Sequence, residues 1–191
     1  MGVLYALESI RTPALDKIMS VITLLGGELF FMVIAVTAFW CVSKREGYYL
    51  MIVGFFGTVI NQFLKILCCV PRPWIKDPDF TIVESARAEA TGYSFPSGHS
   101  SKAGAFFGGL ALAGKKRRWV PWVCGAAILL VMFSRNYLGV HTPQDVLVGA
   151  ATGVLCAFLL ARLLRWADEG QNRDLLITAI GAALCGLSLW Y

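Results

Sequence analysis

The stretch QDVLVGAATGVLCAFLLARLLRW at residues 144–166 decides the fold class of this chain. It is almost wholly apolar and, at ~1.5 Å rise per residue, long enough to cross the hydrocarbon core of a bilayer as one helix. A second stretch of this kind, YYLMIVGFFGTVINQFLKILC, occupies residues 48–68. Backbone groups in lipid must be hydrogen-bonded within their own segment, and no strand alternation competes. Both stretches are therefore predicted to be membrane-spanning helices.

The composition of the whole chain is that of a membrane protein. Of its 191 residues, 57% are hydrophobic and only 15% are charged, whereas a soluble domain usually carries about 25% charged residues. Four further apolar segments are predicted to be helices, at 27–43, 99–114, 119–133 and 174–191. We therefore expect an all-α, polytopic membrane helix bundle of about six transmembrane helices, forming one domain over residues 1–191.

The first 26 residues differ from the segments that follow. Apolar and charged positions are mixed there, and Pro13 divides them. This pattern predicts one or two amphipathic helices lying at the membrane interface over residues 1–26. An ordinary cytosolic leader is the alternative interpretation.

Basic residues indicate the orientation of the chain in the membrane. The net charge is +5, but much of it stands in short clusters beside apolar segments, which favours a topology signal over nucleic-acid binding. The compact basic runs gather on one predicted side: Lys44-Arg45, residues 115–118, Arg162, Arg165 and Arg173. The positive-inside rule makes that side cytoplasmic, so the loops at 69–98 and 134–143 are expected to be extracytoplasmic. We expect a multi-pass protein of a cell membrane, such as a bacterial inner or plasma membrane.

Small residues suggest how the helices pack. Gly104/Gly108 and Gly149/Gly153 form two Gly-xxx-Gly pairs, which would let the helices predicted at 99–114 and 144–166 approach closely. The six cysteines lack Cys-x-x-Cys spacing and lie mostly in apolar runs. They are therefore expected to act as small hydrophobic residues.

Both histidines of the chain fall in polar clusters. The clusters are Lys65-x6-Arg72-Pro73, Pro96-Ser97-Gly98-His99 and Ser134-Arg135-x5-His141-x3-Asp145. All three lie on the same predicted face of the membrane. Two imidazoles, three cations and one carboxylate are the side chains that phosphoryl transfer needs, and their convergence on one face is the main evidence for a site.

The cluster that contains His99 has the features of a helix start. Ser97 and Gly98 can cap a helix whose free N–H groups and partial positive charge attract an anion. His99 would then stand in the first turn beside that anion. The alternative is a plain Ser/Gly cap with a bystander histidine.

The cluster that contains His141 also allows two interpretations. Thr142 suits a helix N-cap and Asp145 suits the third helical position, so Asp145 could be only a helix-start acid. In the functional interpretation Asp145 accepts a hydrogen bond from His141, which orients the imidazole and leaves its other nitrogen free for attack. Arg135 would bind phosphate oxygens as a bidentate fork.

The remaining cations are Lys65, Arg72 and Lys102. A lysine near the end of an apolar helix, such as Lys65, often only extends to the interface. Arg72 is flanked by two prolines, and a rigid arginine there suits anion recognition. Lys102 lies three residues after His99, on nearly the same helix face, and would either contact a second phosphate or head group or extend to the interface.

Together the three clusters resemble the three signature motifs of the type 2 phosphatidic acid phosphatase family, in its integral-membrane lipid phosphatase branch. Every signature position matches, in order and with the family spacings, over residues 65–145. The resemblance implies a phosphatase that needs no metal and no cofactor and acts through a phosphohistidine. It makes His141 the nucleophile and Asp145 its orienting carboxylate, while His99 protonates the leaving oxygen and later helps to activate water. The groups expected to hold the phosphoryl oxygens are Lys65, Arg72, Arg135 and the backbone N–H groups near Ser97 and Gly98.

The long loop is not expected to bind a metal. Its acidic residues, Asp77, Asp79, Glu84 and Glu89, are irregularly spaced and are expected to be solvated. The loop from Trp74 to Phe95 is expected to cover the site and to help select the head group.

The expected substrate is a lipid phosphate, and the expected surroundings are the bilayer, with no nucleic acid and no required protein partner. Bacterial relatives of this size, as the resemblance implies, act on undecaprenyl pyrophosphate, phosphatidylglycerol phosphate or phosphatidate. Vanadate-dependent haloperoxidases share the motifs, but they are soluble. The alternative from another class is a lipid-binding or lipid-moving protein that kept this fold without catalysis, against which the intact His99, His141 and Asp145 argue.

Overall fold

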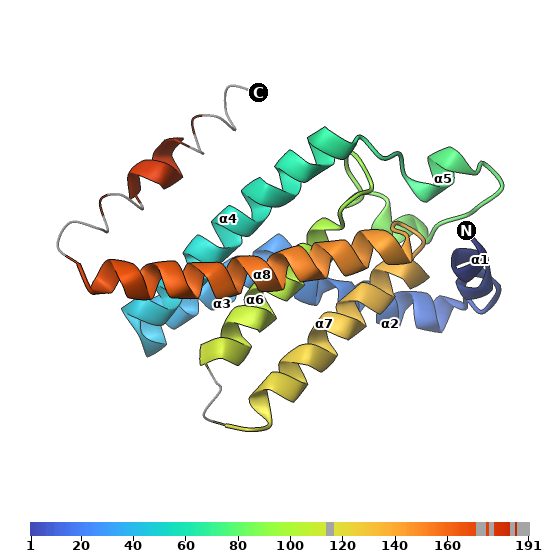
Figure 1. Cartoon of the computed structure of the whole chain (residues 1–191). Helices are drawn as coiled ribbons and strands as arrows, with labels where there is room; N and C mark the ends of the chain where they lie inside the picture. The colour runs from blue at the N-terminus through green and yellow to red at the C-terminus, as the bar shows by residue number, and fades with distance from the viewer. Residues whose placement is uncertain (114–116, 171–174, 176–177, 184–185, 187–191) are drawn as a thin grey trace.

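The computed structural model describes residues 1–113, 117–170, 175, 178–183 and 186, and every regular element within them is helical (Figure 1). The α-helices are α1 (Gly2–Ser9), α2 (Pro13–Thr23), α3 (Glu28–Thr37), α4 (Lys44–Cys68), α5 (Pro73–Lys76), α6 (Gly98–Ala113), α7 (Val120–Tyr137) and α8 (Pro143–Asp168). Three shorter elements are the 3₁₀ turns Leu24–Gly26 and Glu84–Ala86 and the π-helical turn Ala38–Val42. The all-α prediction is confirmed for the described residues.

Three helical stretches are long and apolar enough to cross a membrane: Lys44–Lys76, Val120–Tyr137 and Pro143–Asp168. Pro13–Gly26 and Glu28–Val42, bent by 48° relative to each other, would make a fourth if they form one broken span. These findings confirm a multi-pass helical membrane protein. The count of six spans stays a prediction, because α6 has only 16 residues and the segment expected at 174–191 lies largely outside the described residues.

The N-terminal segment forms two helices, α1 and α2, as the position of Pro13 predicts. Thr12 caps α2 by accepting a hydrogen bond from the N–H of Leu15 at 3.3 Å. Between the two helices, the Arg11 side chain donates to the carbonyl of Tyr137 at 3.1 Å and to that of Thr81 at 2.8 Å. The N-terminal segment therefore holds the end of α7 and the long loop together. Its placement at the membrane interface stays a prediction.

Helix α6 packs most extensively against α8 and also contacts α4 and α7. Glycine makes this approach possible, because a Cβ at Gly149 would overlap the carbonyl oxygen of Ser97 and one at Gly153 would overlap that of Ser101. The predicted close packing of these two helices is thus confirmed. It also sets the start of α6 directly against α8.

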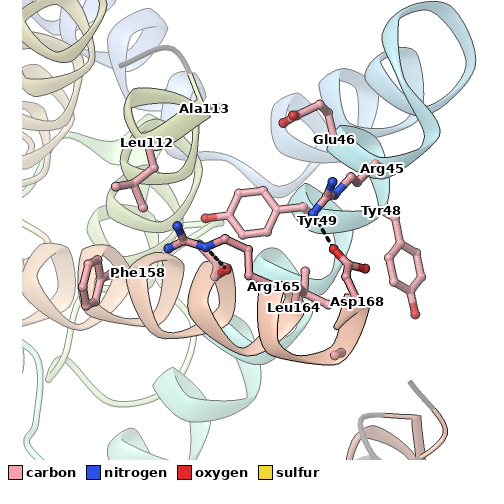
Figure 2. Close-up of a pocket in the computed structure, with 12 residues that line it drawn as sticks. Arg45, Glu46, Tyr48, Tyr49, Leu112, Ala113, Phe158, Leu164, Arg165 and Asp168 are labelled. Atoms are coloured by element: carbon pink, nitrogen blue, oxygen red, sulfur yellow. Dashed lines mark hydrogen bonds and ion pairs between the residues drawn. The ribbon is translucent and has the colours of Figure 1, made fainter. Parts of the chain in front are cut away.

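A cavity of about 300 Å³ opens between the start of α4 and the ends of α6 and α8 (Figure 2). Tyr49 donates to the carbonyl of Ala157 at 2.8 Å beneath it, and Arg45 forms an ion pair with Asp168 at its edge. No residue of the three motifs lines this cavity. In Figure 1 the end of α4, the end of α7 and the start of α8 lie instead toward the opposite end of the bundle, on the side of α1 and α5.

Candidate active site

The structure brings the three sequence clusters together at one end of the bundle. Arg72 Nη1 lies 3.0 Å from His141 Nε2, which joins the first cluster to the third. The Ser97 N–H donates to the carbonyl of Asp145 at 2.9 Å, which joins the second cluster to the third. Lys65, in the last turn of α4, lies close enough to Arg72 and Asp145 for charge interactions. The expected convergence of the clusters is therefore present in the geometry.

Asp145 both caps α8 and faces His141. Its Oδ2 accepts hydrogen bonds from the Thr142 N–H at 2.8 Å and from Ser94 Oγ at 2.6 Å. The same oxygen lies 3.6 Å from Nδ1 of His141, both side chains are buried, and Nδ1 has no hydrogen-bond partner among the described residues. Asp145 is therefore a helix-start acid that also lies beside His141. The hydrogen bond expected between the two side chains is not formed at this distance, and the catalytic role of Asp145 stays a prediction.

The contact between Arg72 and His141 determines which nitrogen of the His141 imidazole carries the hydrogen. A guanidinium only donates hydrogen bonds, so the nitrogen that faces it, Nε2, must present its lone pair. The hydrogen of the neutral ring then lies on Nδ1, which faces Asp145. Burial also disfavours the charged imidazolium and holds the pKa of His141 below its usual value near 6.5. His141 is thus a neutral imidazole with its lone pair directed at a cation.

Arg72 is itself buried and held by the backbone of two separate segments. Its guanidinium donates to the carbonyls of Thr91 at 2.7 Å, Gly92 at 3.0 Å and Val140 at 3.0 Å. It caps α5 between Pro71 and Pro73. The rigid arginine that the two prolines predict therefore also fixes the loop that follows it.

Arg135 lies in the last turn of α7 and is fully buried. Its Nη1 donates to Thr23 Oγ1 at 3.0 Å, whereas its buried Nε finds no hydrogen-bond acceptor among the described residues. A buried guanidinium N–H without an acceptor destabilises the folded protein. An anion oxygen that accepted this hydrogen bond would remove that destabilisation. Of the features described, this unsatisfied N–H is the most direct sign of an anion-binding pocket.

Ser97 caps the start of α6, as the Pro96–His99 motif predicts. Ser97 Oγ accepts from the Ser100 N–H at 3.4 Å. The N–H of Ser97 is engaged by Asp145, so the first-turn amides left without an intrahelical acceptor are those of Gly98 and His99. The backbone N–H groups expected to bind phosphate are therefore those of Gly98 and His99, and not that of Ser97.

Glu89 departs from the expectation that the acids of the long loop are solvated. Its carboxylate is partly exposed, but Oε2 lies 3.0 Å from Nε2 of His99 and 3.8 Å from Nη1 of Arg135. The hydrogen bond from His99 lowers the pKa of Glu89 and keeps it ionised. Glu84, by comparison, pairs with Arg87 at 2.7 Å and is 75% exposed, as expected of a solvated acid.

Lys102 has a different partner from the one considered in the sequence. Its Nζ lies 2.9 Å from Oε2 of Glu28 at the start of α3. A role as a head-group contact stays a prediction, and it would require Lys102 to share or exchange this partner.

Comparison with known proteins agrees with the geometry. The sequence model of the PAP2 superfamily matches residues 45–169, which is most of the chain and includes all three clusters. The chain belongs to the PAP2 superfamily. Among the PAP2 proteins that it resembles, phosphatidylglycerophosphatase B of Bacillus subtilis is 32% identical over 167 residues, covering 79% of this chain and 76% of that protein.

Two further comparisons agree with the family. The undecaprenyl-diphosphatase BcrC of Bacillus subtilis is 32% identical over 120 residues, covering 63% of this chain and 58% of that protein. The crystal structure of a transmembrane PAP2-type phosphatidylglycerolphosphate phosphatase from Bacillus subtilis superposes with a TM-score of 0.70 at 30% identity. That match covers 84% of this chain and 81% of the other.

Two side chains of this PAP2 site, Ser94 and Glu89, were missed in the sequence. Ser94 is buried and donates to Asp145, but its place in the loop carries no periodic signal. Glu89 stands ten positions before His99, a spacing that matches no helical or metal-ligand pattern. Among the residues that the structure describes, no group of three His, Cys, Asp or Glu side chains could hold a metal ion.

Proposed function

We propose that this PAP2 protein is an integral-membrane lipid phosphatase that cleaves a phosphate group from its substrate without a metal ion, through a phosphohistidine on His141. The observation that carries the proposal is the arrangement of Asp145, His141 and Arg72. The imidazole is buried between a carboxylate and a guanidinium, with Nε2 directed at the group that would hold the phosphate. A nucleophile, its orienting group and a phosphate-binding cation are thus aligned.

In the first step, Nε2 of His141 attacks the phosphorus atom and the bond to the lipid oxygen breaks. The leaving oxygen takes a proton from His99. Asp145 stabilises the positive charge that develops on the His141 ring. Lys65, Arg72 and Arg135 bind the equatorial oxygens, so that fixed cations carry the charge that metal ions carry in other phosphatases.

In the second step, water attacks the phosphohistidine and the P–N bond breaks. His99, now neutral, accepts a proton from that water. Nε2 recovers its lone pair, and inorganic phosphate leaves. The same histidine therefore serves as acid and then as base.

The position of the site supports a lipid substrate. It lies where two of the candidate spans, α4 and α7, end and the third, α8, begins. A head group can enter there while its acyl or prenyl chains stay in the hydrocarbon. The names of the relatives suggest undecaprenyl pyrophosphate and phosphatidylglycerol phosphate, and phosphatidate is the third candidate.

A panel assay tests the proposal. Detergent-purified protein is given each of these lipids and a soluble sugar phosphate in the presence of EDTA, with His141→Ala as control. We expect phosphate release that survives EDTA and vanishes in the variant, and the best lipid names the substrate. Binding of lipid without release would instead support a lipid-binding or lipid-moving protein.

Lys102 offers a test for diphosphates. If it leaves Glu28 to hold a second phosphate, Lys102→Ala slows diphosphate lipids more than monophosphates. Equal slowing of both classes would remove that role.

The proposed orientation places the site on the extracytoplasmic side. Cys69 ends α4 beside the site, and Cys41 lies near the other end of the same helix; both are exposed. In intact cells, a membrane-impermeant thiol reagent should label a variant that keeps only Cys69 and spare one that keeps only Cys41. The opposite pattern would reverse the orientation.

A further inference from the structure

We propose that Glu89 is a positioning residue that forms a second carboxylate–imidazole pair with His99, parallel to the pair that Asp145 forms with His141. Glu89 lies outside the three motifs. The inference rests on the proposed phosphatase function and adds to it the group that controls the acid–base histidine.

The first support is the geometry of the pair. Oε2 of Glu89 is 3.0 Å from Nε2 of His99, and the pKa of Glu89 is lowered because it accepts this hydrogen bond. An ionised carboxylate only accepts hydrogen bonds, so Nε2 of His99 must carry a hydrogen. The proton that moves during the reaction is then the one on Nδ1.

The second support is that the position of Glu89 is held from within the site. Arg72 binds the carbonyls of Thr91 and Gly92, the second and third residues after Glu89, at 2.7 and 3.0 Å. The guanidinium that contacts the nucleophile therefore also anchors the backbone that presents this carboxylate. A side chain on a free surface loop would have no such anchor.

The third support is the charge around His99. Burial lowers the pKa of His99, and the positive charges of Arg135 and Lys102 lower it further. The hydrogen bond to Glu89, at 3.0 Å, opposes this shift and favours the protonated imidazole. Without Glu89, the protonated form of His99 would be rarer and less able to supply a proton to a leaving oxygen.

The proton balance closes over both steps. His99 gives its Nδ1 proton to the oxygen that leaves phosphorus, and it remains as the neutral tautomer with Nε2–H bound to Glu89. When water attacks the phosphohistidine, the Nδ1 lone pair accepts a proton from that water. Glu89 stays ionised throughout and holds the ring in the same orientation for both transfers.

Glu89 could instead block the anion pocket by occupying the place of a phosphate oxygen. The distances argue against this. Its oxygen is 3.8 Å from Nη1 of Arg135, beyond a hydrogen bond, whereas Thr23 accepts from that nitrogen at 3.0 Å. The buried Nε of Arg135 is left without an acceptor in the described structure. The anion-binding group is therefore not satisfied by Glu89.

Two aryl phosphates of nearly equal shape test the proposal without depending on the lipid. Phenyl phosphate needs its leaving oxygen protonated, whereas p-nitrophenyl phosphate releases a stable anion. In Glu89→Gln we expect kcat/KM for phenyl phosphate to fall by about 10²-fold and that for p-nitrophenyl phosphate by less than about fivefold. Glu89→Asp should recover part of the loss on phenyl phosphate.

Glu84→Gln is the matched control, because it makes the same change in the same loop at an exposed ion pair with Arg87. We expect it to leave both substrates unchanged. Equal losses on both substrates in Glu89→Gln would assign Glu89 a purely structural role, and a gain on both would show that it blocks the pocket; either result overturns the proposal. Failure of the lipid phosphatase function is seen separately, as hydrolysis of the aryl phosphates with no lipid accepted.

Discussion

Arg72 and His141 contact each other directly, with Nη1 of the guanidinium 3.0 Å from Nε2 of the imidazole. In the proposed mechanism, the lone pair that attacks phosphorus is therefore covered in this structure by the cation proposed to bind the phosphate. An incoming phosphate offers the guanidinium better acceptors than a neutral nitrogen does, because charge-assisted hydrogen bonds are roughly twice as strong as neutral ones. Substrate binding would thus uncover the nucleophile and place the phosphorus atom beside it in one movement.

Replacing Arg72 by lysine tests this contact. Lysine keeps the charge but cannot reach His141 and three carbonyls at once, so we expect kcat/KM to fall by about 10²-fold or more. Arg87→Lys is a suitable control. Arg72 and Arg87 both stack on Trp74, but Arg87 is exposed and lies outside the site. Phosphate release from the preferred lipid measures both variants, and wild-type rates in Arg72→Lys would contradict the assigned role.

Replacing Asp145 by asparagine separates capping from catalysis. Asparagine can still accept from the Thr142 N–H, so the start of α8 should persist and thermal unfolding should change little. It cannot stabilise an imidazolium, so kcat should fall by about 10³–10⁴-fold. Ser94→Ala, which removes one donor to the same oxygen, should cost about tenfold. A large loss of stability with little loss of rate in Asp145→Asn would make the residue a helix cap only.

The pKa of His141 can be observed directly, because the chain has only two histidines. With ¹⁵N-histidine labelling and His99→Gln for assignment, NMR should show His141 titrating below 6.5, since burial disfavours its charged form. As the pH falls, the unfolded chain takes up a proton on this histidine before the folded protein does. The free energy of unfolding therefore falls as the pH drops below about 6.5. A midpoint at or above 6.5 would show that burial does not lower the pKa of His141.

The close approach of α6 and α8 is tested at Gly153. An alanine there would overlap the carbonyl of Ser101, so we expect Gly153→Ala to lower the free energy of unfolding by about 1–3 kcal/mol or to prevent folding. Gly125→Ala in α7 is the control, because a Cβ at that position meets no neighbour within 4 Å. Thermal unfolding in detergent compares the two. Equal stability of both variants would mean that the helices can separate without cost.

The features that could be predicted are those that depend only on the local sequence. Spans at 48–68 and 144–166 follow from apolar length alone, and α4 and α8 confirm them as candidate spans. The segment predicted at 119–133 is short, and it becomes a candidate span because α7 continues to Tyr137. The shared location of the three motifs follows from alternating helices, since every second connection returns to the same side. The break at Pro13 follows from its lack of a backbone donor.

Contacts that depend on the path of the long loop could not be predicted. Glu89 contacts His99 in a loop whose backbone Arg72 binds at Thr91. Ser94, in the same loop, donates to Asp145 in a separate helix. The engagement of the Ser97 N–H by Asp145 is likewise a contact between separate helices. Spacing along the chain carries no information on such pairs.

The passage of phosphate through His141 is most directly tested by trapping the intermediate. Purified protein is mixed with its lipid phosphate, quenched in alkali within the first turnover, digested and analysed by mass spectrometry. We predict one phosphoryl group on the peptide that contains His141, absent from His141→Ala. Phosphate release with no phosphoryl group on that peptide, or with the group on the His99 peptide instead, would contradict the mechanism.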